Sequence, residues 1–156
     1  MNSFLPSKQF KDVLEYTPLV SIDFIVKNKD GKILLGRRVN KPAKDFFFTV
    51  GGRIYKNEKI VDAKTRIIKD ELNLDFKDLN LKFIGIYEHF YEDSFIDDNI
   101  STHYVNFAYE INISYIQDLP KDQHNDYILL SLDELLNSNV VHEYVKDYFI
   151  NSNCNI

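Results

Sequence analysis

Alternating apolar and polar positions, together with β-branched and aromatic runs, predict a series of strands along the chain. Residues 20–27 and 32–38 form two such runs, and Lys29-Asp30-Gly31 between them predicts the turn of a hairpin. The run Phe46-Phe47-Phe48-Thr49-Val50 predicts a buried strand that leads into two glycines. Further strands are expected at residues 81–90, 102–113 and 127–130.

Apolar positions three and four residues apart predict helices in the remaining segments. A cap residue such as Ser or Asn marks the expected start of two of them, and the spacing of Ser131 and Glu134 is that of a capping box. The expected helices are residues 7–16 with Ser7 as cap, residues 58–72 with Asn57 as cap, a short helix after Ser131, and an amphipathic segment over residues 140–149.

Strands and helices that follow one another without a linker or a repeat predict one core. We therefore expect an α/β (α+β) fold, a mixed β-sheet packed between helices, as a single domain over residues 1–150. A polar tail is expected at residues 151–156.

Composition narrows the classes of partner and compartment. A net charge of −5 makes nucleic acid an unlikely partner, so any phosphate binding must come from a few placed arginines and a metal ion. The single cysteine, Cys154, excludes an intramolecular disulfide and a cysteine metal cluster. The sequence shows neither a signal-peptide pattern nor an apolar run long enough to span a membrane, which predicts a cytoplasmic protein without a membrane partner.

Candidate chemistry begins at Gly51-Gly52-Arg53, which predicts a glycine turn that feeds a helix with carboxylates at fixed intervals. Glycines let the backbone approach a ligand closely, and a carboxylate such as Glu71 can hold Mg²⁺, which prefers oxygen ligands. The spacing Gly52, Glu58, Arg66, Glu71 resembles the Nudix box. The competing interpretation is an amphipathic helix with a surface ladder of ion pairs at Asp62, Arg66 and Asp70.

The segment departs from the usual Nudix box at two informative positions. Asn73 stands where the box ends in glycine, and Asn is the next choice for a left-handed residue at a helix end. Ile67 stands where the box carries a glutamate, so a carboxylate that helps to gather several metal ions is missing. Fewer metal ions are therefore expected, and an attack at an atom other than phosphorus.

Further segments resemble one branch of the Nudix superfamily, the GDP-mannose mannosyl hydrolases. This resemblance covers nearly the whole chain in order, and that branch also lacks the glutamate that Ile67 replaces. Val50, where the branch usually has proline, and Asn73 depart from it. The matching segments are Thr17-Pro18-Leu19-Val20-Ser21, Asp23-Phe24-Ile25-Val26, Leu34-Leu35-Gly36-Arg37-Arg38, Pro42-Ala43, His89-Phe90-Tyr91, Thr102-His103-Tyr104-Val105 and Gln123-His124-Asn125-Asp126-Tyr127.

The resemblance implies hydrolysis of a GDP-sugar at the anomeric carbon, with inversion, to GDP and free hexose. Inverting hydrolysis needs a base for water and stabilisation of the leaving group, and a diphosphate can leave as an anion. The resemblance also implies one Mg²⁺ per subunit and a homodimer. Two alternatives remain open: a Nudix pyrophosphatase that attacks phosphorus, and a non-catalytic module that binds nucleotide sugars.

The resemblance assigns roles to particular side chains. His124 is the candidate general base, since imidazole titrates near neutral pH. The candidate metal ligands are the carbonyl of Gly51, Glu71 and Gln123; the other candidates are Arg38 and Arg53 for the diphosphate, Asp23, His89 and Tyr104 at the reacting centre, Phe4 and Phe10 for stacking on guanine, and Arg37 and Tyr127 for binding substrate.

Plainer interpretations stand beside four of these assignments. They are a solvated loop histidine for His124, an outward polar position for Asp23, a core residue for Phe10 and a surface charge for Arg37.

Overall fold

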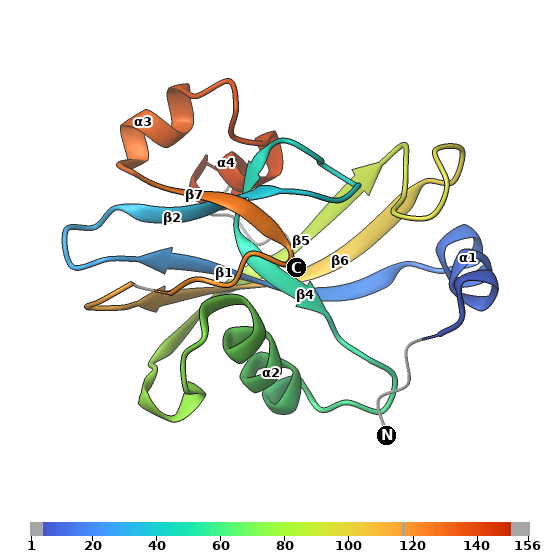
Figure 1. Ribbon diagram of the computed structural model, residues 1–156, viewed down its shortest axis with the longest axis horizontal. Helices are drawn as coiled ribbons and strands as arrows, with labels where there is room; N and C mark the ends of the chain where they lie inside the picture. The colour runs from blue at the N-terminus through green and yellow to red at the C-terminus, as the bar shows by residue number, and fades with distance from the viewer. Residues whose placement is uncertain (1–4, 117, 151–156) are drawn as a thin grey trace.

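A seven-stranded mixed sheet forms the centre of the protein, and helices cover both of its faces (Figure 1). The computed structural model describes residues 5–116 and 118–150. The strands are β1 (Leu19–Lys27), β2 (Ile33–Arg38), β3 (Phe47–Phe48), β4 (Val50–Arg53), β5 (Leu81–Tyr91), β6 (Thr102–Asn112) and β7 (His124–Leu130). The helices are α1 (Ser7–Tyr16), α2 (Ile60–Leu72), α3 (Leu132–Asn137), α4 (Glu143–Ile150) and the 3₁₀ turn η1 (Phe76–Asp78). The expected mixed sheet between helices is thus confirmed.

The pairing of β1 creates a split in the sheet. The main path runs β3-β2-β1-β6-β5, with β1 parallel to β6 and antiparallel to β2. Along the edge that faces β2, only Val26 and Lys27 pair with that strand, whereas residues 21–24 pair with β4. The predicted hairpin is therefore confirmed near its turn, but its two strands separate, and β4 takes the place of β2 beside β1. The strand β7 pairs with the other edge of β2.

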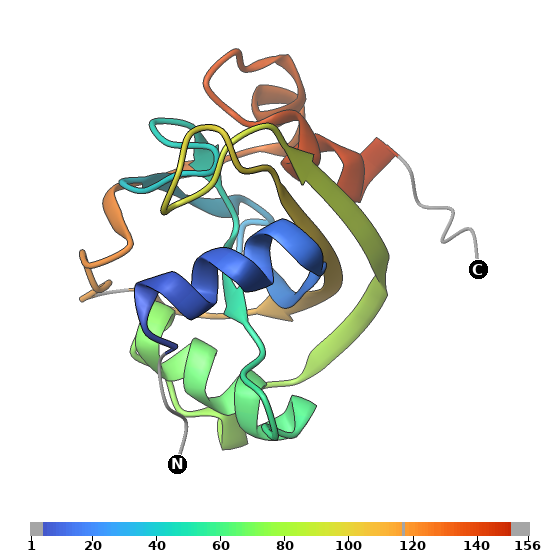
Figure 2. The same ribbon diagram turned by 90° about the vertical axis from the view of Figure 1, so that its right-hand side faces the viewer.

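Side chains of β1 alternate between the two faces of the sheet, as the period of a strand requires. Ile22, Phe24 and Val26 enter the core that packs against α2, and Ile25 enters the core that includes Val145 of α4. In Figure 2, α2 lies on one side of the curved sheet and α4 on the other, while α1 crosses the end of the molecule nearest the viewer. Polar side chains of β1 that share a face with Ile25 are therefore carried towards α4.

Two predicted helix ends are confirmed. They are the left-handed end at Asn73 and the capping box at Ser131. Asn73 ends α2 in the left-handed conformation, with φ 54°. The capping box of α3 forms, because the Ser131 hydroxyl accepts from the Glu134 backbone and the Glu134 carboxylate accepts from the Ser131 backbone.

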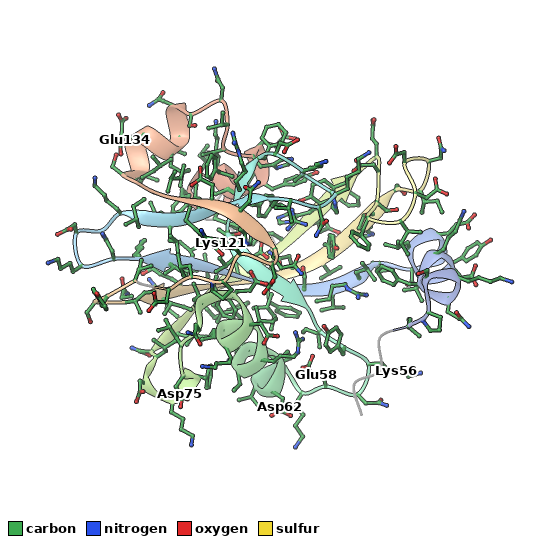
Figure 3. The ribbon with its side chains drawn as sticks, viewed as in Figure 1. Lys56, Glu58, Asp62, Asp75, Lys121 and Glu134 are labelled. Carbon is green, nitrogen blue, oxygen red and sulfur yellow. The ribbon has the colours of Figure 1, made fainter. Side chains whose placement is uncertain are left out.

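Three local predictions at the other helix starts are wrong. Ser7 is the first residue of α1 and makes no capping hydrogen bond; Pro6 precedes it. Asn57 lies in a left-handed turn, and α2 begins at Ile60, because the Glu58 carboxylate instead accepts the backbone N–H of Tyr55. Figure 3 marks Glu58 just ahead of that helix.

The predicted glycine turn is also wrong. Gly51 and Gly52 belong to β4 and pair with Asp23 and Ile22 of β1, so the turn comes only afterwards, around residues 56–57. Both glycines are strand residues rather than loop residues, and neighbouring side chains approach them so closely that an added Cβ would be crowded.

None of the helices in the described residues is long and apolar enough to cross a membrane. Phe4, Cys154 and the tail at residues 151–156, to which the sequence analysis assigned roles, lie outside the described residues.

Candidate active site

The candidate residues meet where β2 separates from β1. Strand β7 brings His124 to this place, β1 brings Asp23, β4 brings Gly51, and α2 brings Glu71 from below the sheet. His124 was predicted in a loop, but it is the first residue of β7 and pairs with Arg38. Segments that are far apart in the sequence therefore converge on one edge of the split.

His124 and Glu71 form the first part of the site. Nδ1 of His124 lies 3.3 Å from Oε2 of Glu71, and both side chains are buried, with 2% and 7% of their surface exposed. Gly36 makes room for the imidazole, because a Cβ at that position would lie 2.5 Å from its Cγ. The plainer interpretation of His124 as a solvated residue is therefore wrong.

The two ring nitrogens of His124 have no hydrogen-bond partner among the described residues, since Nδ1 and Glu71 are close but poorly aligned. A carboxylate only accepts, so its approach favours the proton on Nδ1. The lone pair then resides on Nε2, which is buried and has no partner among the described residues. Such an acceptor nitrogen would take a proton from a water molecule bound beside it.

Glu71 is also suited to a divalent cation. A buried carboxylate is costly without a positive partner. Arg66, on the same helix, is engaged elsewhere: it binds the Glu58 carboxylate at 2.8 and 2.9 Å and the carbonyl of Arg53 at 2.8 Å. Arg66 therefore orients Glu58. Its contact with Asp70 is looser, with 4.0 Å between Nη1 of Arg66 and Oδ2 of Asp70. A bound cation would supply a positive partner for the Glu71 carboxylate.

The remaining metal ligands would have to be neutral oxygens. Within the described residues, no three His, Cys, Asp or Glu side chains gather as a metal site. Gly51 lies on the strand next to Asp23, and the exposed Gln123 directly precedes His124. Carbonyl and amide oxygens of this kind are acceptable ligands for Mg²⁺ beside a single carboxylate.

Asp23 forms the second part of the site, on the face of the sheet that α4 covers. Its Oδ2 accepts hydrogen bonds from the Tyr148 hydroxyl at 2.5 Å and from the Thr49 hydroxyl at 3.2 Å. Tyr148 also lies 3.3 Å from Nε2 of His89 and accepts from the amide of Asn106 at 2.7 Å. Asp23 is 8% exposed, so its interpretation as an outward polar residue is wrong.

Burial shifts the titration of both ionisable groups in this network. It raises the pKa of the Asp23 carboxyl from 3.8 to about 6, and the bonds from Tyr148 and Thr49 and the charge of Arg38 oppose the rise. It lowers the pKa of His89 to about 3, with the charge of His142 acting in the same direction. Above pH 7 the network therefore contains a carboxylate and a neutral imidazole.

Two arginines and a tyrosine add positive charge and a phenol near the second part of the site. They are Arg38, Arg53 and Tyr104. Arg38 acts electrostatically on Asp23 and Tyr104, and its Nε donates to the carbonyl of Pro42 at 2.8 Å. Arg53 also acts on Tyr104, and its guanidinium lies 4.1 Å from the ring centre of Phe10 in α1. One face of the Phe10 ring is thus already covered by a cation, as in a cation–π contact.

The other two predicted substrate-binding residues occupy different surroundings. Tyr127 is next to His124, with 5.7 Å between the ring centres, and donates its hydroxyl proton to the carbonyl of Pro120. Arg37 lies over the ring of Phe47, 5.3 Å from its centre, and no contact joins it to Asp23 or His124. The structure therefore brings Tyr127, but not Arg37, to the first part of the site.

Sequence reasoning missed Tyr148, Asn106 and Thr49. Asn106 and Thr49 sit inside apolar runs, where a polar residue gives no signal of its own, and Tyr148 lies in an amphipathic segment, where a tyrosine is an ordinary core residue. Three aspartates of the loop between β5 and β6 form surface ion pairs: Lys41 pairs with Asp93 at 3.5 Å and Asp98 at 2.6 Å, and Lys11 pairs with Asp97 at 2.8 Å.

Replacing Asp23 by asparagine is expected to stabilise the protein at neutral pH while impairing activity. The folded state holds the Asp23 proton more tightly than the unfolded state, so this group costs stability progressively as pH rises from about 4 to about 6. Two pKa units correspond to at most about 3 kcal/mol. Urea unfolding should show a gain for Asp23→Asn at pH 7.5 and little gain at pH 4. An equal change at both values, or the same change in the exposed-turn control Asp30→Asn, would contradict the assignment.

Comparisons with known proteins agree with this architecture. The family model described as NUDIX domain matches residues 17–149. The low-salt glycan biosynthesis protein Agl8 of Haloferax volcanii is 34% identical over 109 residues, which cover 70% of this chain and 68% of that protein. An ADP-ribose pyrophosphatase of Methanocaldococcus jannaschii is 40% identical over 70 residues, 45% of this chain and 40% of that protein. The MutT protein of Methanosarcina mazei has the same fold, with a TM-score of 0.69 at 16% identity over 88% of this chain and 94% of its own.

Proposed function

Because the chain belongs to the NUDIX domain family of hydrolases, we propose that it hydrolyses a GDP-sugar of the GDP-mannose type at the anomeric C–O bond. The products are GDP and a free hexose with inverted configuration. The enzyme acts on a nucleotide-derived substrate with one Mg²⁺ per subunit.

The observation that carries this proposal is the buried His124 with its free Nε2 beside Glu71. A pyrophosphatase site needs carboxylates that gather metal ions around phosphorus, whereas attack on a sugar carbon needs a base for water. Ile67 supports the same conclusion, because it is 1% exposed and packs within the apolar core beside Gly52. This position contributes volume to the core instead of a metal ligand.

The proposed reaction is a single displacement. Nε2 of His124 takes a proton from water as the water oxygen attacks the anomeric carbon, and the electrons of the breaking C–O bond remain on the β-phosphate oxygen of GDP. Glu71, the Gly51 carbonyl and Gln123 would hold a divalent cation, which would supply Lewis-acid stabilisation of the departing diphosphate. Arg38 and Arg53 add positive charge, so that no general acid is required.

The name of the Haloferax relative supports a role connected with sugars, since activated sugars are the donors of glycan synthesis. The alternative is a Nudix pyrophosphatase that attacks phosphorus, and the partial similarity to an ADP-ribose pyrophosphatase favours it. The two reactions give different products from the same substrate. GDP and mannose mark cleavage at carbon, and GMP and mannose 1-phosphate mark cleavage at phosphorus.

Hydrolysis of GDP-mannose in ¹⁸O-water is expected to leave the nucleotide product unlabelled. Water that attacks carbon delivers its oxygen to the sugar, and water that attacks phosphorus delivers it to a phosphate. Mass spectrometry should be read on the nucleotide, because the anomeric oxygen of free mannose exchanges with water. Label in GMP or in mannose 1-phosphate would establish the pyrophosphatase, and the absence of any turnover with Mg²⁺ would favour a binding module.

A further inference from the structure

The hydrogen bonds around Tyr148 form a chain of donors that ends at the Asp23 carboxylate. The buried phenol keeps its proton, because burial and the charge of Asp23 raise its pKa well above the ordinary value. That single proton points to Oδ2 of Asp23. The Tyr148 oxygen must then accept from the Asn106 amide and from Nε2–H of the neutral His89. Asn106 in turn accepts the hydroxyl proton of Ser21 at 2.8 Å.

This arrangement leaves the two oxygens of Asp23 in different surroundings. Oδ2 receives both hydroxyl protons, from Tyr148 and Thr49. Oδ1 faces the backbone of Gly51, so closely that a Cβ at that residue would collide with it. A carboxylate fixed through one oxygen has a defined orientation, and its second oxygen lies beside Gly51 of β4.

We propose that Tyr148 is a positioning residue, which holds Asp23 and His89 in one orientation so that Oδ1 of Asp23 can accept a hydrogen bond from a substrate hydroxyl beside Gly51. The identity of that hydroxyl, on the sugar, rests on the proposed function. The orientation of Asp23 does not rest on it. The C-terminal helix α4 therefore contributes to the site through a residue that does not touch the substrate.

Tyr144 provides a matched control on the same helix. Its ring stacks on His89 with 4.4 Å between centres, and its hydroxyl bonds to the backbone N–H and carbonyl of Phe90, at 3.0 and 2.8 Å. Tyr144→Phe thus removes a hydroxyl with two hydrogen bonds beside His89 but leaves Asp23 untouched. Tyr148→Phe removes the hydroxyl that Asp23 uses and keeps the ring, which packs edge-on against Tyr87 at 4.8 Å.

The first measurement needs no substrate. In protein labelled with ¹³C at the aspartate carboxyls, the Asp23 signal is assigned by its loss in Asp23→Asn and followed through a pH titration. Removing a donor to the carboxylate disfavours its charged form, so in metal-free protein the loss of the Tyr148 hydrogen bond in Tyr148→Phe should move the Asp23 midpoint above that of the wild type. Tyr144→Phe should leave it unchanged. An unchanged midpoint in Tyr148→Phe would overturn the proposal, whatever the enzyme hydrolyses.

The second measurement is kinetic and uses GDP-mannose with Mg²⁺. Loss of a group that orients a neighbouring ligand typically costs about 10- to 100-fold, and we expect this loss in kcat/KM for Tyr148→Phe but not for Tyr144→Phe. In an Asp23→Asn background, Tyr148→Phe should cost less than about threefold, because the two residues act as a unit. Equal losses in the two tyrosine variants, or full additivity with Asp23→Asn, would show that Tyr148 only supports the fold.

The two readouts separate the possible failures. A shifted titration midpoint without turnover of GDP-mannose would uphold the role of Tyr148 and reject the proposed substrate. If Tyr148→Phe does not fold, His89→Phe serves in its place, because it leaves the Tyr148 hydroxyl present but removes the ring nitrogen that bonds to it. The same upward shift of the Asp23 midpoint, smaller in size, is expected there, and its absence would overturn the proposal.

Discussion

Glu71→Gln is expected to lose metal-dependent activity by orders of magnitude while keeping its fold. Glutamine has nearly the shape of glutamate, but it lacks the charge that a bound Mg²⁺ requires from its single carboxylate. Because Glu71 is buried and His124 is its one ion-pair partner among the described residues, removing its charge should also raise stability when no metal is present. Activity is measured against Mg²⁺ concentration, and thermal unfolding is measured in the presence of a chelator.

The neighbouring carboxylate supplies the control for that experiment. Asp70 is exposed and lies 4.0 Å from Arg66, so Asp70→Asn should retain activity and its Mg²⁺ requirement. If Glu71→Gln kept the wild-type rate with the same Mg²⁺ requirement, Glu71 would have only a structural role.

His124→Gln is expected to reduce turnover about 100- to 10,000-fold, the usual contribution of a general base. The lower end is favoured, because an anomeric carbon becomes electrophilic as the diphosphate departs. Substrate affinity should change little, since we propose that Arg38, Arg53 and the metal hold the diphosphate. The wild-type rate should rise with pH as the base loses its proton, and this limb should vanish in the variant.

The pH profile also tests the competing bases. His89 cannot produce a limb near neutrality, because burial lowers its pKa to about 3. Asp23 could, since its pKa is about 6. A His124→Gln enzyme that keeps the acid limb and loses less than about tenfold, against the loss expected for a base, would assign the role to Asp23. His103→Gln is the matched control, because that histidine stacks on Phe90, on the outer strands β5 and β6.

The strands and helices could be predicted because their signals are local. Alternation of apolar residues marks β1, β5 and β6, and the left-handed Asn73 follows from the preference of helix ends. The position of His124 could not be predicted in this way. The residues around it are polar and lack a strand pattern, and the ring is buried only because Gly36 on the paired strand has no side chain.

Gly51 and Gly52 show the same limit of prediction from local sequence. Adjacent glycines are typical of turns, yet Gly51 and Gly52 lie in a strand because Asp23 and Ile67 need the space that a side chain would fill. The partner of Asp23 was equally hidden, since Tyr148 is 125 residues away in the sequence. Residues that are so far apart in the sequence leave no recognisable spacing when they contact one another, whereas a motif on a single helix does.

The hydrogen bond between Asp23 and Tyr148 also sets a time order for assembly. Chains emerge from the ribosome from the N-terminus onwards, and contacts between distant segments form late. Asp23 is made early, its parallel neighbour β6 follows more than seventy residues later, and α4 comes after both. Until α4 has been synthesised, Asp23 lacks the Tyr148 hydroxyl. A chain truncated before α4 would therefore carry His124 and Glu71 but not the hydrogen-bond donor that we propose to orient Asp23.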